Sequence, residues 1–345
     1  MTLSRAMLFT LLLPSLISCG NLNPQILSNS KPLHDDAEKQ FRASYLSLAT
    51  GRLKDGAPRQ TYAWPFEALS IGHTMSSYQN YGGDPYFHHG LDIRGDADLD
   101  VLASAGGKVV NIENYFPGSP AYWEVAILDD QGFLWQYHHI ERRSIPEEVW
   151  EAYRNKTSIA QGTKLGEIYY WSVVTYGERY HHVHLNILDA DGNYLNPFSF
   201  LEDLGDQQTP KIEEVGILKN GRRWTNSTVS GQYTLYAKVH DLILHDKFSV
   251  PPYEITYSVD GTAPKTVWRF DNLPGGSSNE RYVDEFFNPS LTCGNYQCRE
   301  LAVDLGFKKD GIDYFTTEAG SHSVKIEARD FAGNTTSTVF NWQVQ

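Results

Sequence analysis

Short apolar runs separated by polar, Gly-containing turns recur from residue 62 onward, and they constrain the fold more than any other feature of the sequence. Residues 123–128 (WEVAIL) end at the turn 129–132 (DDQG), which leads into residues 133–137 (FLWQY). Two such runs joined by a turn with glycine predict a β-hairpin. The aromatic content of 13% also favours strands. We therefore expect a mainly β fold, with one short helix in this region at residues 145–155 (IPEEVWEAYRN).

The C-terminal part of the chain shows strict alternation of apolar and polar residues. Leu235, Ala237 and Val239 form one such run, and comparable runs cover residues 255–259 and 324–328. Alternating runs divided by turns predict an antiparallel sandwich of the immunoglobulin type. The turn at residues 330–334 (DFAGN) also resembles a turn that is common in bacterial immunoglobulin-like modules.

The polar, aperiodic stretch at residues 203–214 separates the two regions. We expect a first domain at residues 62–205, a linker at 206–214 and the sandwich at 215–345.

The N-terminus has the pattern of a cleaved export signal at residues 1–18. Arg5 is followed by a short apolar run, too short to span a bilayer, and then by Leu16-Ile17-Ser18-Cys19. This tetrapeptide resembles the lipobox of bacterial lipoproteins, in which the cysteine is lipidated. A plain secretory signal with an incidental Cys19 is the alternative. The resemblance implies a lipid-anchored protein on the periplasmic side of the envelope, at the outer membrane because Gly20 follows the cysteine.

Residues 19–61 then form a tether with a short helix, predicted at residues 35–50 from the spacing of Phe41, Tyr45 and Leu48.

Two other composition features limit the possibilities. Cys293 and Cys298 are five residues apart, which suits a small disulfide loop in an oxidising compartment. A zinc half-site is the alternative, although the sequence has no second cysteine pair to complete it. The formal net charge is −13, with no clustered basic stripe, so nucleic acid is not expected as a partner.

Seven of the twelve histidines fall in three short segments, at residues 88–89, 138–139 and 181–184. Imidazole is the commonest side-chain metal ligand, and Asp92 follows His88 with Gly90 between them. Glycine permits a loop tight enough for both side chains to reach one metal ion. On a strand, His182 and His184 project to the same face. Together these residues could supply a zinc site with three protein ligands and one open position.

The first domain resembles the lysostaphin-type, or LytM-like, zinc endopeptidases, which cut peptide cross-bridges in bacterial cell walls. The residues that carry the resemblance are His88–Asp92 (His-x-Gly-x-Asp), residues 100–110 (DVLASAGGKVV), Tyr137–Ile140 (Tyr-x-His-Leu in the family), residues 162–168 (GTKLGEI), His182-Val183-His184, and Asn196-Pro197-Phe198.

This resemblance implies that His88, Asp92 and His184 ligate one Zn²⁺ ion and that His139 and His182 are catalytic. The implied substrate is peptidoglycan or another extracytoplasmic peptide. His89, His138 and His181 are bystanders on this interpretation, with His138 expected to point away from His139. The alternative is a non-catalytic envelope protein that binds the wall or regulates wall hydrolases.

Two departures from the family concern the surroundings of the histidine pair. The family has a glycine-rich turn before it, whereas this chain has residues 171–180 (WSVVTYGERY). The family has Phe-Glu after it, whereas this chain has Leu185-Asn186. These changes affect the expected wall of the substrate site and leave the expected ligands in place.

Overall fold

The structure, a computed structural model, describes residues 45–52, 62–66, 74–77, 90–172, 174–175, 178–179, 181–203, 205–241, 252–269, 271–273, 301–308 and 311–345. The predictions for the export signal, Cys19, His88, His89, Cys293 and Cys298 therefore lie outside the described residues. Over the described ranges the fold is mainly β with antiparallel sheets, as predicted. No helix in these ranges has the length and apolar character needed to cross a membrane.

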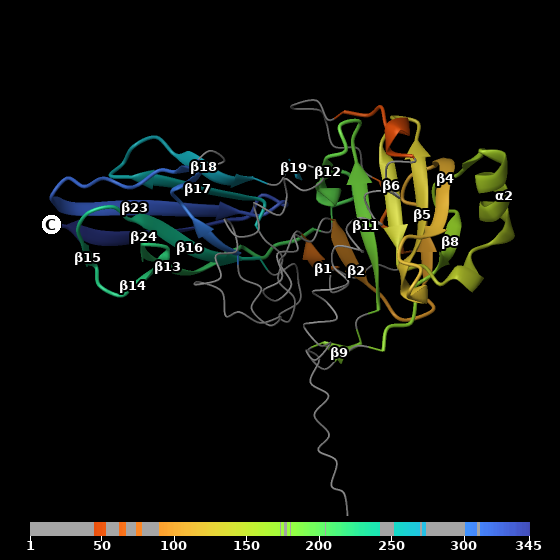
Figure 1. Ribbon diagram of the computed structural model, residues 1–345, viewed down its shortest axis with the longest axis horizontal. Coiled ribbons are helices and arrows are strands. Elements are labelled where there is room, and N and C mark those ends of the chain that lie inside the picture. Colours follow the sequence, from red (N-terminus) through yellow and green to blue (C-terminus); the bar gives the residue numbers. More distant parts are fainter. Residues whose placement is uncertain are drawn as a thin grey trace, which may run out of the picture.

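The N-terminal half is built on one large antiparallel sheet (Figure 1). Its strand order is β1-β2-β11-β6-β5-β4-β7, and β12 and β19 extend it beyond β11. The predicted hairpin is confirmed as β5 and β6, which pair on either side of the turn at residues 130–133. The strands are β1 (Thr74–Ser77), β2 (Leu91–Arg94), β4 (Gly107–Asn114), β5 (Trp123–Asp129), β6 (Leu134–His138), β7 (Ser158–Ile159), β11 (His182–Leu188), β12 (Tyr194–Leu195) and β19 (Asn272–Leu273).

The predicted short helix is α2 (Glu147–Asn155), at the outer end of this sheet (Figure 1). Val149 and Ala152 are buried, and Lys156 ends the helix in the left-handed conformation. The smaller elements around it are β3 (Asp100–Leu102) paired with β8 (Lys164–Glu167), β9 (Val174–Thr175) paired with β10 (Glu178–Arg179), and 3-10 turns at Leu46–Leu48, Pro120–Tyr122, Arg142–Ser144 and Pro197–Ser199. Of the helix expected at residues 35–50, the structure describes residues 45–50, where a 3-10 turn covers Leu46–Leu48 and residues 49–50 are not helical.

The two faces of the large sheet have different chemistry. One face is apolar and packs into a core, with side chains such as Ile93, Val125, Tyr137, Val183 and Leu185 almost fully buried. Because successive strand residues point to opposite faces, the residues between them form the other face. That second face carries polar side chains at the end of the sheet where β11 begins, and it is the face that holds the candidate site.

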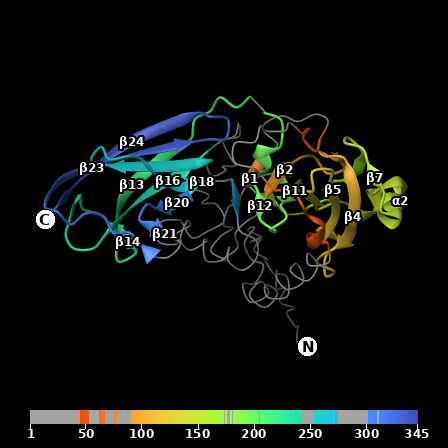
Figure 2. The same cartoon turned by 90° about the horizontal axis from the view of Figure 1, so that it is seen from above.

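The C-terminal half is the predicted two-sheet sandwich (Figures 1 and 2). Its sheets have the orders β14-β13-β16-β20 and β15-β24-β23-β17-β18, and apolar residues of both share one core. β13 begins at Lys211, so the last residues of the segment expected to be a linker are strand. The strands are β13 (Lys211–Lys219), β14 (Arg222–Trp224), β15 (Thr228–Val229), β16 (Thr234–His240), β17 (Glu254–Val259), β18 (Lys265–Arg269), β20 (Leu301–Asp304), β21 (Phe307–Lys308), β22 (Gly311–Ile312), β23 (Gly320–Arg329) and β24 (Thr335–Val344).

The two halves are joined by direct contacts. β19, which follows the first strands of the sandwich in the chain, pairs with β12 of the large sheet. Phe198 packs near Phe331 with ring centroids 5.8 Å apart, and Asn334 Nδ2 donates to the Asp206 carbonyl at 3.0 Å. The turn at residues 330–334 therefore touches the segment that connects the domains.

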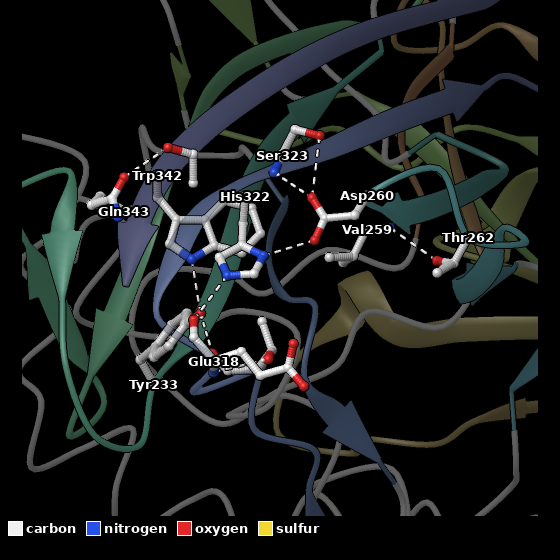
Figure 3. Close-up of polar contacts among 11 residues, drawn as sticks. Tyr233, Val259, Asp260, Thr262, Glu318, His322, Ser323, Trp342 and Gln343 are labelled. Carbon is white, nitrogen blue, oxygen red and sulfur yellow. Dashed lines mark hydrogen bonds and ion pairs between the residues drawn. The ribbon is translucent and has the colours of Figure 1, made fainter. Parts of the chain in front are cut away.

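An imidazole in the sandwich is held on both of its nitrogens (Figure 3). His322 Nδ1 lies 2.7 Å from Asp260 Oδ2, and Nε2 lies 3.0 Å from the Glu318 carbonyl. Both partners are acceptors, so both nitrogens carry protons and the ring is the charged imidazolium. The bond to Asp260 raises the pKa of His322, and the same bond lowers the pKa of Asp260.

Candidate metal and catalytic site

A row of four buried polar side chains crosses the sheet near the start of β11. Asp92 on β2 pairs with His184 on β11, His184 pairs with His138 on β6, and His138 pairs with Glu124 on β5. Residues directly opposite one another on neighbouring strands project to the same face. All four are buried. The strand register therefore brings together residues separated by up to 92 positions in the chain.

Asp92 and His184 have the separation expected of two ligands of one metal ion. Asp92 Oδ1 lies 2.9 Å from His184 Nδ1. Two donor atoms on a tetrahedral zinc, each about 2.0–2.2 Å from the metal, are about 3.3–3.5 Å apart. A shift of a few tenths of an ångström would admit the ion. Carboxylate oxygen and imidazole nitrogen are also the donors that catalytic zinc takes, so the residues present fit this metal.

Asn186 holds the Nε2 side of His184. His184 Nε2 lies 2.9 Å from Asn186 Oδ1, and since that oxygen can only accept, Nε2 carries a proton. Nδ1 faces the Asp92 carboxylate, which also accepts, so Nδ1 donates to it here and would give up this proton to ligate a metal. Asn186 Nδ2 in turn donates to Gln136 Oε1 and to His138 Nε2, both at 3.3 Å. The sequence interpretation did not select Asn186, although residues 182, 184 and 186 share one face by alternation.

His139 reaches the site because the backbone leaves the strand conformation there. Its φ is 65°, in the left-handed region, directly after β6 ends at His138. Strand alternation places His138, and not Tyr137, on the face of His184. The expectation that His138 points away from the site was therefore wrong. Its Nε2 lies 3.5 Å from Glu124 Oε2, and its ring lies 5.3 Å from that of His184.

Two imidazoles lie beside the Asp92–His184 pair. The ring centroids of His139 and His182 are 4.7 Å apart, and His182 Nε2 lies 3.7 Å from Asp92 Oδ1. His139 Nδ1 lies 2.8 Å from the Ala121 carbonyl, so Nδ1 donates and Nε2 is the nitrogen that can accept a proton. Burial, together with neighbouring His182, holds the pKa of His139 well below its ordinary value. The imidazole is thus neutral near pH 7.

His181 occupies a different place from the other two histidines of its segment. Its Nδ1 accepts a hydrogen bond from the Trp171 backbone N–H at 3.0 Å. Burial, with the charge of Arg179, lowers its pKa. The residue thus anchors the segment that precedes the strand, as suits one that was expected to be a bystander.

Gly90 lies where the start of β2 closely approaches β11, a contact that the sequence did not predict. Its φ is 92°, and a Cβ built on it would lie 2.2 Å from Asn186 Oδ1 and 2.4 Å from the Leu185 carbonyl. Only glycine fits this position. The loop enters β2 against the backbone of β11, which leads directly to Asp92.

Within the described ranges, one group of three or more acidic, imidazole or thiol ligands clusters within 4.8 Å, namely Asp206, Asp241 and Asp330 near the junction of the two halves. The Asp92–His184 pair supplies two ligands. The third ligand of the predicted set, His88, lies outside the described residues, as does His89.

No protein-family model matches the chain, and no curated protein does. Several solved structures are similar to parts of it. A protein of Pseudomonas aeruginosa described as a peptidase M23 is 19% identical with a TM-score of 0.33, over 50% of this chain and 62% of that one. A protein of Ruminococcus gnavus described as a glycyl-glycine endopeptidase lytM is 19% identical with a TM-score of 0.25, over 37% and 60% of the two chains. Lysostaphin from Staphylococcus simulans, an antimicrobial peptidase, is 15% identical with a TM-score of 0.29, over 64% and 96%. This chain thus spans less than two thirds of the first two structures.

Proposed function

We propose that this chain is a zinc-dependent endopeptidase that hydrolyses peptide bonds in cell-wall peptidoglycan. In this proposal His88, Asp92 and His184 hold one zinc ion, and His139 and His182 are the catalytic residues. The observation that carries it is the Asp92–His184 pair at 2.9 Å with two further buried imidazoles beside it. These four side chains come from three separate segments, β2, β11 and the residue after β6, and are buried together, which chance histidine pairs on a surface would not be.

Each side chain has a role that follows from its contacts. Zinc, when bound, acts as a Lewis acid and lowers the pKa of its water to about 7. His139 is neutral and presents Nε2, so it can take the proton of an attacking water. His182, next to Asp92, can stabilise negative charge on the oxygen of the attacked carbonyl. Asn186 holds His184 in the tautomer that ligates.

The test uses residues 20–345, which leaves out the expected export signal and Cys19. Zinc is measured by elemental analysis, and release of peptide fragments from purified peptidoglycan is followed by chromatography. We expect one zinc per chain and cleavage that is lost in His139→Ala and Asp92→Ala. His322→Ala, a histidine variant in the sandwich, should cleave normally.

A chain without stoichiometric zinc would refute the enzyme proposal. Zinc binding without any cleavage would favour the non-catalytic alternative, a protein that binds the wall or regulates wall hydrolases.

We also propose that the protein is anchored to the envelope through lipidated Cys19, on the periplasmic side, and that Cys293 and Cys298 form a disulfide. A Cys19→Ser variant should then move from the membrane fraction to the soluble fraction. If this variant stays in the membrane fraction, the proposal of a lipid anchor at Cys19 is wrong. Mass spectrometry of the unreduced protein would detect the disulfide, and free thiols at both positions would exclude it.

A further inference from the structure

Trp171 contacts both imidazoles that the proposed function makes catalytic. Its ring stacks on His182 with centroids 5.5 Å apart and an interplanar angle of 18°. It meets the ring of His139 edge-on at 5.0 Å and that of Tyr122 edge-on at 6.1 Å. The backbone N–H of Trp171 donates to His181 Nδ1 at 3.0 Å. The residue is therefore fixed to the start of β11 at one end and to the site at the other.

The indole N–H of Trp171 has no acceptor among the described residues, although the nitrogen is buried. Three other indoles among the described residues, all buried, have acceptors. Trp64 donates to the Glu202 carbonyl, Trp135 donates to Asp129 Oδ2, and Trp342 donates to the Tyr233 hydroxyl, all at 2.8–2.9 Å. A buried donor without a partner is unfavourable, and an acceptor that reached this one would remove that cost.

The acceptor of such a donor can arrive with a bound molecule. An indole N–H only donates, so its partner must present an acceptor atom. A peptide offers a carbonyl oxygen at every residue. The stacking on His182 and the edge-on contact with His139 hold the indole ring beside the two imidazoles.

We propose that Trp171 is a substrate-binding residue whose indole N–H donates to a carbonyl oxygen of the bound peptide and positions the scissile bond between His139 and His182. The inference rests on the proposed function, since it names a peptide as the ligand of the same site. It also gives a role to Trp171, which begins the segment where the lysostaphin-type family has a glycine-rich turn.

The first test is Trp171→Phe, which keeps an aromatic ring and removes the N–H. We expect kcat/KM for peptidoglycan fragments to fall about 10-fold, as for the loss of one hydrogen bond. The zinc content and zinc affinity should not change. Trp150→Phe is the matched control, because Trp150 lies on α2 and packs on Trp123. It should cleave like the wild type.

The second test does not depend on cleavage. The protein is zinc-loaded His139→Ala labelled with ¹⁵N. Its Trp171 indole resonance is assigned as the one that is missing from the spectrum of the double variant with Trp171→Phe. The probe is a cross-linked muropeptide dimer released from peptidoglycan by a muramidase. We expect this resonance to move downfield when the dimer is added, and the Trp150 resonance to stay in place.

The outcomes separate the two proposals. A wild-type protein that does not cleave, but whose Trp171 resonance moves with the dimer, would refute the endopeptidase and retain the binding residue. The inference is overturned if Trp171→Phe cleaves as fast as the wild type and if the Trp171 resonance of the His139→Ala protein does not move when the dimer is added. A shift caused by zinc alone, with no further change on adding the dimer, would overturn it as well.

Discussion

Replacing Asn186 tests whether the polar network beside His184 prepares a metal ligand. Asn186 is 1% exposed, and its Oδ1 accepts from His184 Nε2 at 2.9 Å. In Asn186→Ala this acceptor is lost and His184 is free to adopt the other tautomer. Loss of such an outer hydrogen bond typically weakens metal binding about 10- to 100-fold, or about 1.4–2.7 kcal/mol. We therefore expect zinc affinity to fall by that factor.

The same substitution should also destabilise the metal-free protein. Asn186 Nδ2 donates to Gln136 Oε1 and His138 Nε2, both at 3.3 Å in the interior. Leaving a buried acceptor unpaired costs about 1–3 kcal/mol. We expect the free energy of unfolding in urea, measured with a chelator present, to fall by about that amount.

Asn186→Asp separates the two effects. The carboxylate still accepts from His184 Nε2, but it cannot donate to Gln136. Zinc affinity should therefore stay near that of the wild type while stability falls. The assay is competition for zinc with a chromophoric chelator. If Asn186→Ala binds zinc as tightly as the wild type, the assignment of His184 Nδ1 as the ligand through this hydrogen bond is refuted.

Three further variants test the fold around the site and the sandwich. Gly90→Ala places a Cβ 2.2 Å from Asn186 Oδ1 at a φ of 92°. An alanine at positive φ costs about 1–2 kcal/mol by itself, so this variant should lower the free energy of unfolding by more than that. Gly162→Ala is the control, because its φ is 81° and nothing lies within 4 Å of the added Cβ, so it should lower the free energy of unfolding by only that amount. Equal urea midpoints for the two variants would contradict the predicted clash at residue 90. The Tyr45 hydroxyl donates to Glu124 Oε1 at 2.6 Å and accepts from Gln136 Nε2 at 2.5 Å. Tyr45→Phe should therefore lower the free energy of unfolding by about 1–3 kcal/mol, and an unchanged value would show that the network is not coupled to this segment. The pKa of His322 is raised in the folded protein, so its contribution to the free energy of unfolding is complete below its unfolded pKa, about 6.5. This contribution disappears as pH rises through the folded pKa. The pKa of Asp260 is lowered in the folded protein, so its contribution to the free energy of unfolding is present above its unfolded pKa, about 3.9. This contribution disappears as pH falls through the folded pKa. The stability difference between wild type and His322→Phe should thus be largest between about pH 4 and 6.5, at about 0.5–1 kcal/mol, and smaller at pH 8.5; a difference that grows with pH would contradict the pair.

The sequence predicts best where local periodicity decides the structure. The hairpin of β5 and β6, the helix α2 and the shared face of His182 and His184 follow from alternation and turn composition alone. In these cases the physical cause lies within a few residues of its effect. Glycine at residue 90 was selected for a different reason, a loop between His88 and Asp92, and that reason stays a prediction because His88 lies outside the described residues.

The parts of the site that the sequence did not give depend on contacts between distant segments. Asn186 is important because strand pairing places Gln136 and His138 next to it. Trp171 contacts His139 and His182, which are 32 and 11 residues away along the chain. His139 was selected by resemblance. It reaches the site because its backbone is in the left-handed conformation directly after β6, and the alternation of strand residues does not predict such a conformation.

The apolar residues of β11 fix the geometry of the polar ones. Val183, Leu185 and Ile187 are completely buried in the core beneath the sheet. A slip of one residue in the register of β11 would bring His182, His184 and Asn186 into that core without partners and put three apolar side chains in place of the polar network. The cost of that exchange holds His184 opposite both Asp92 and His138. The precision of the candidate metal site therefore comes from hydrophobic burial on the opposite face of the same strand. A polar substitution at Val183 should loosen zinc binding even though this residue faces away from the site.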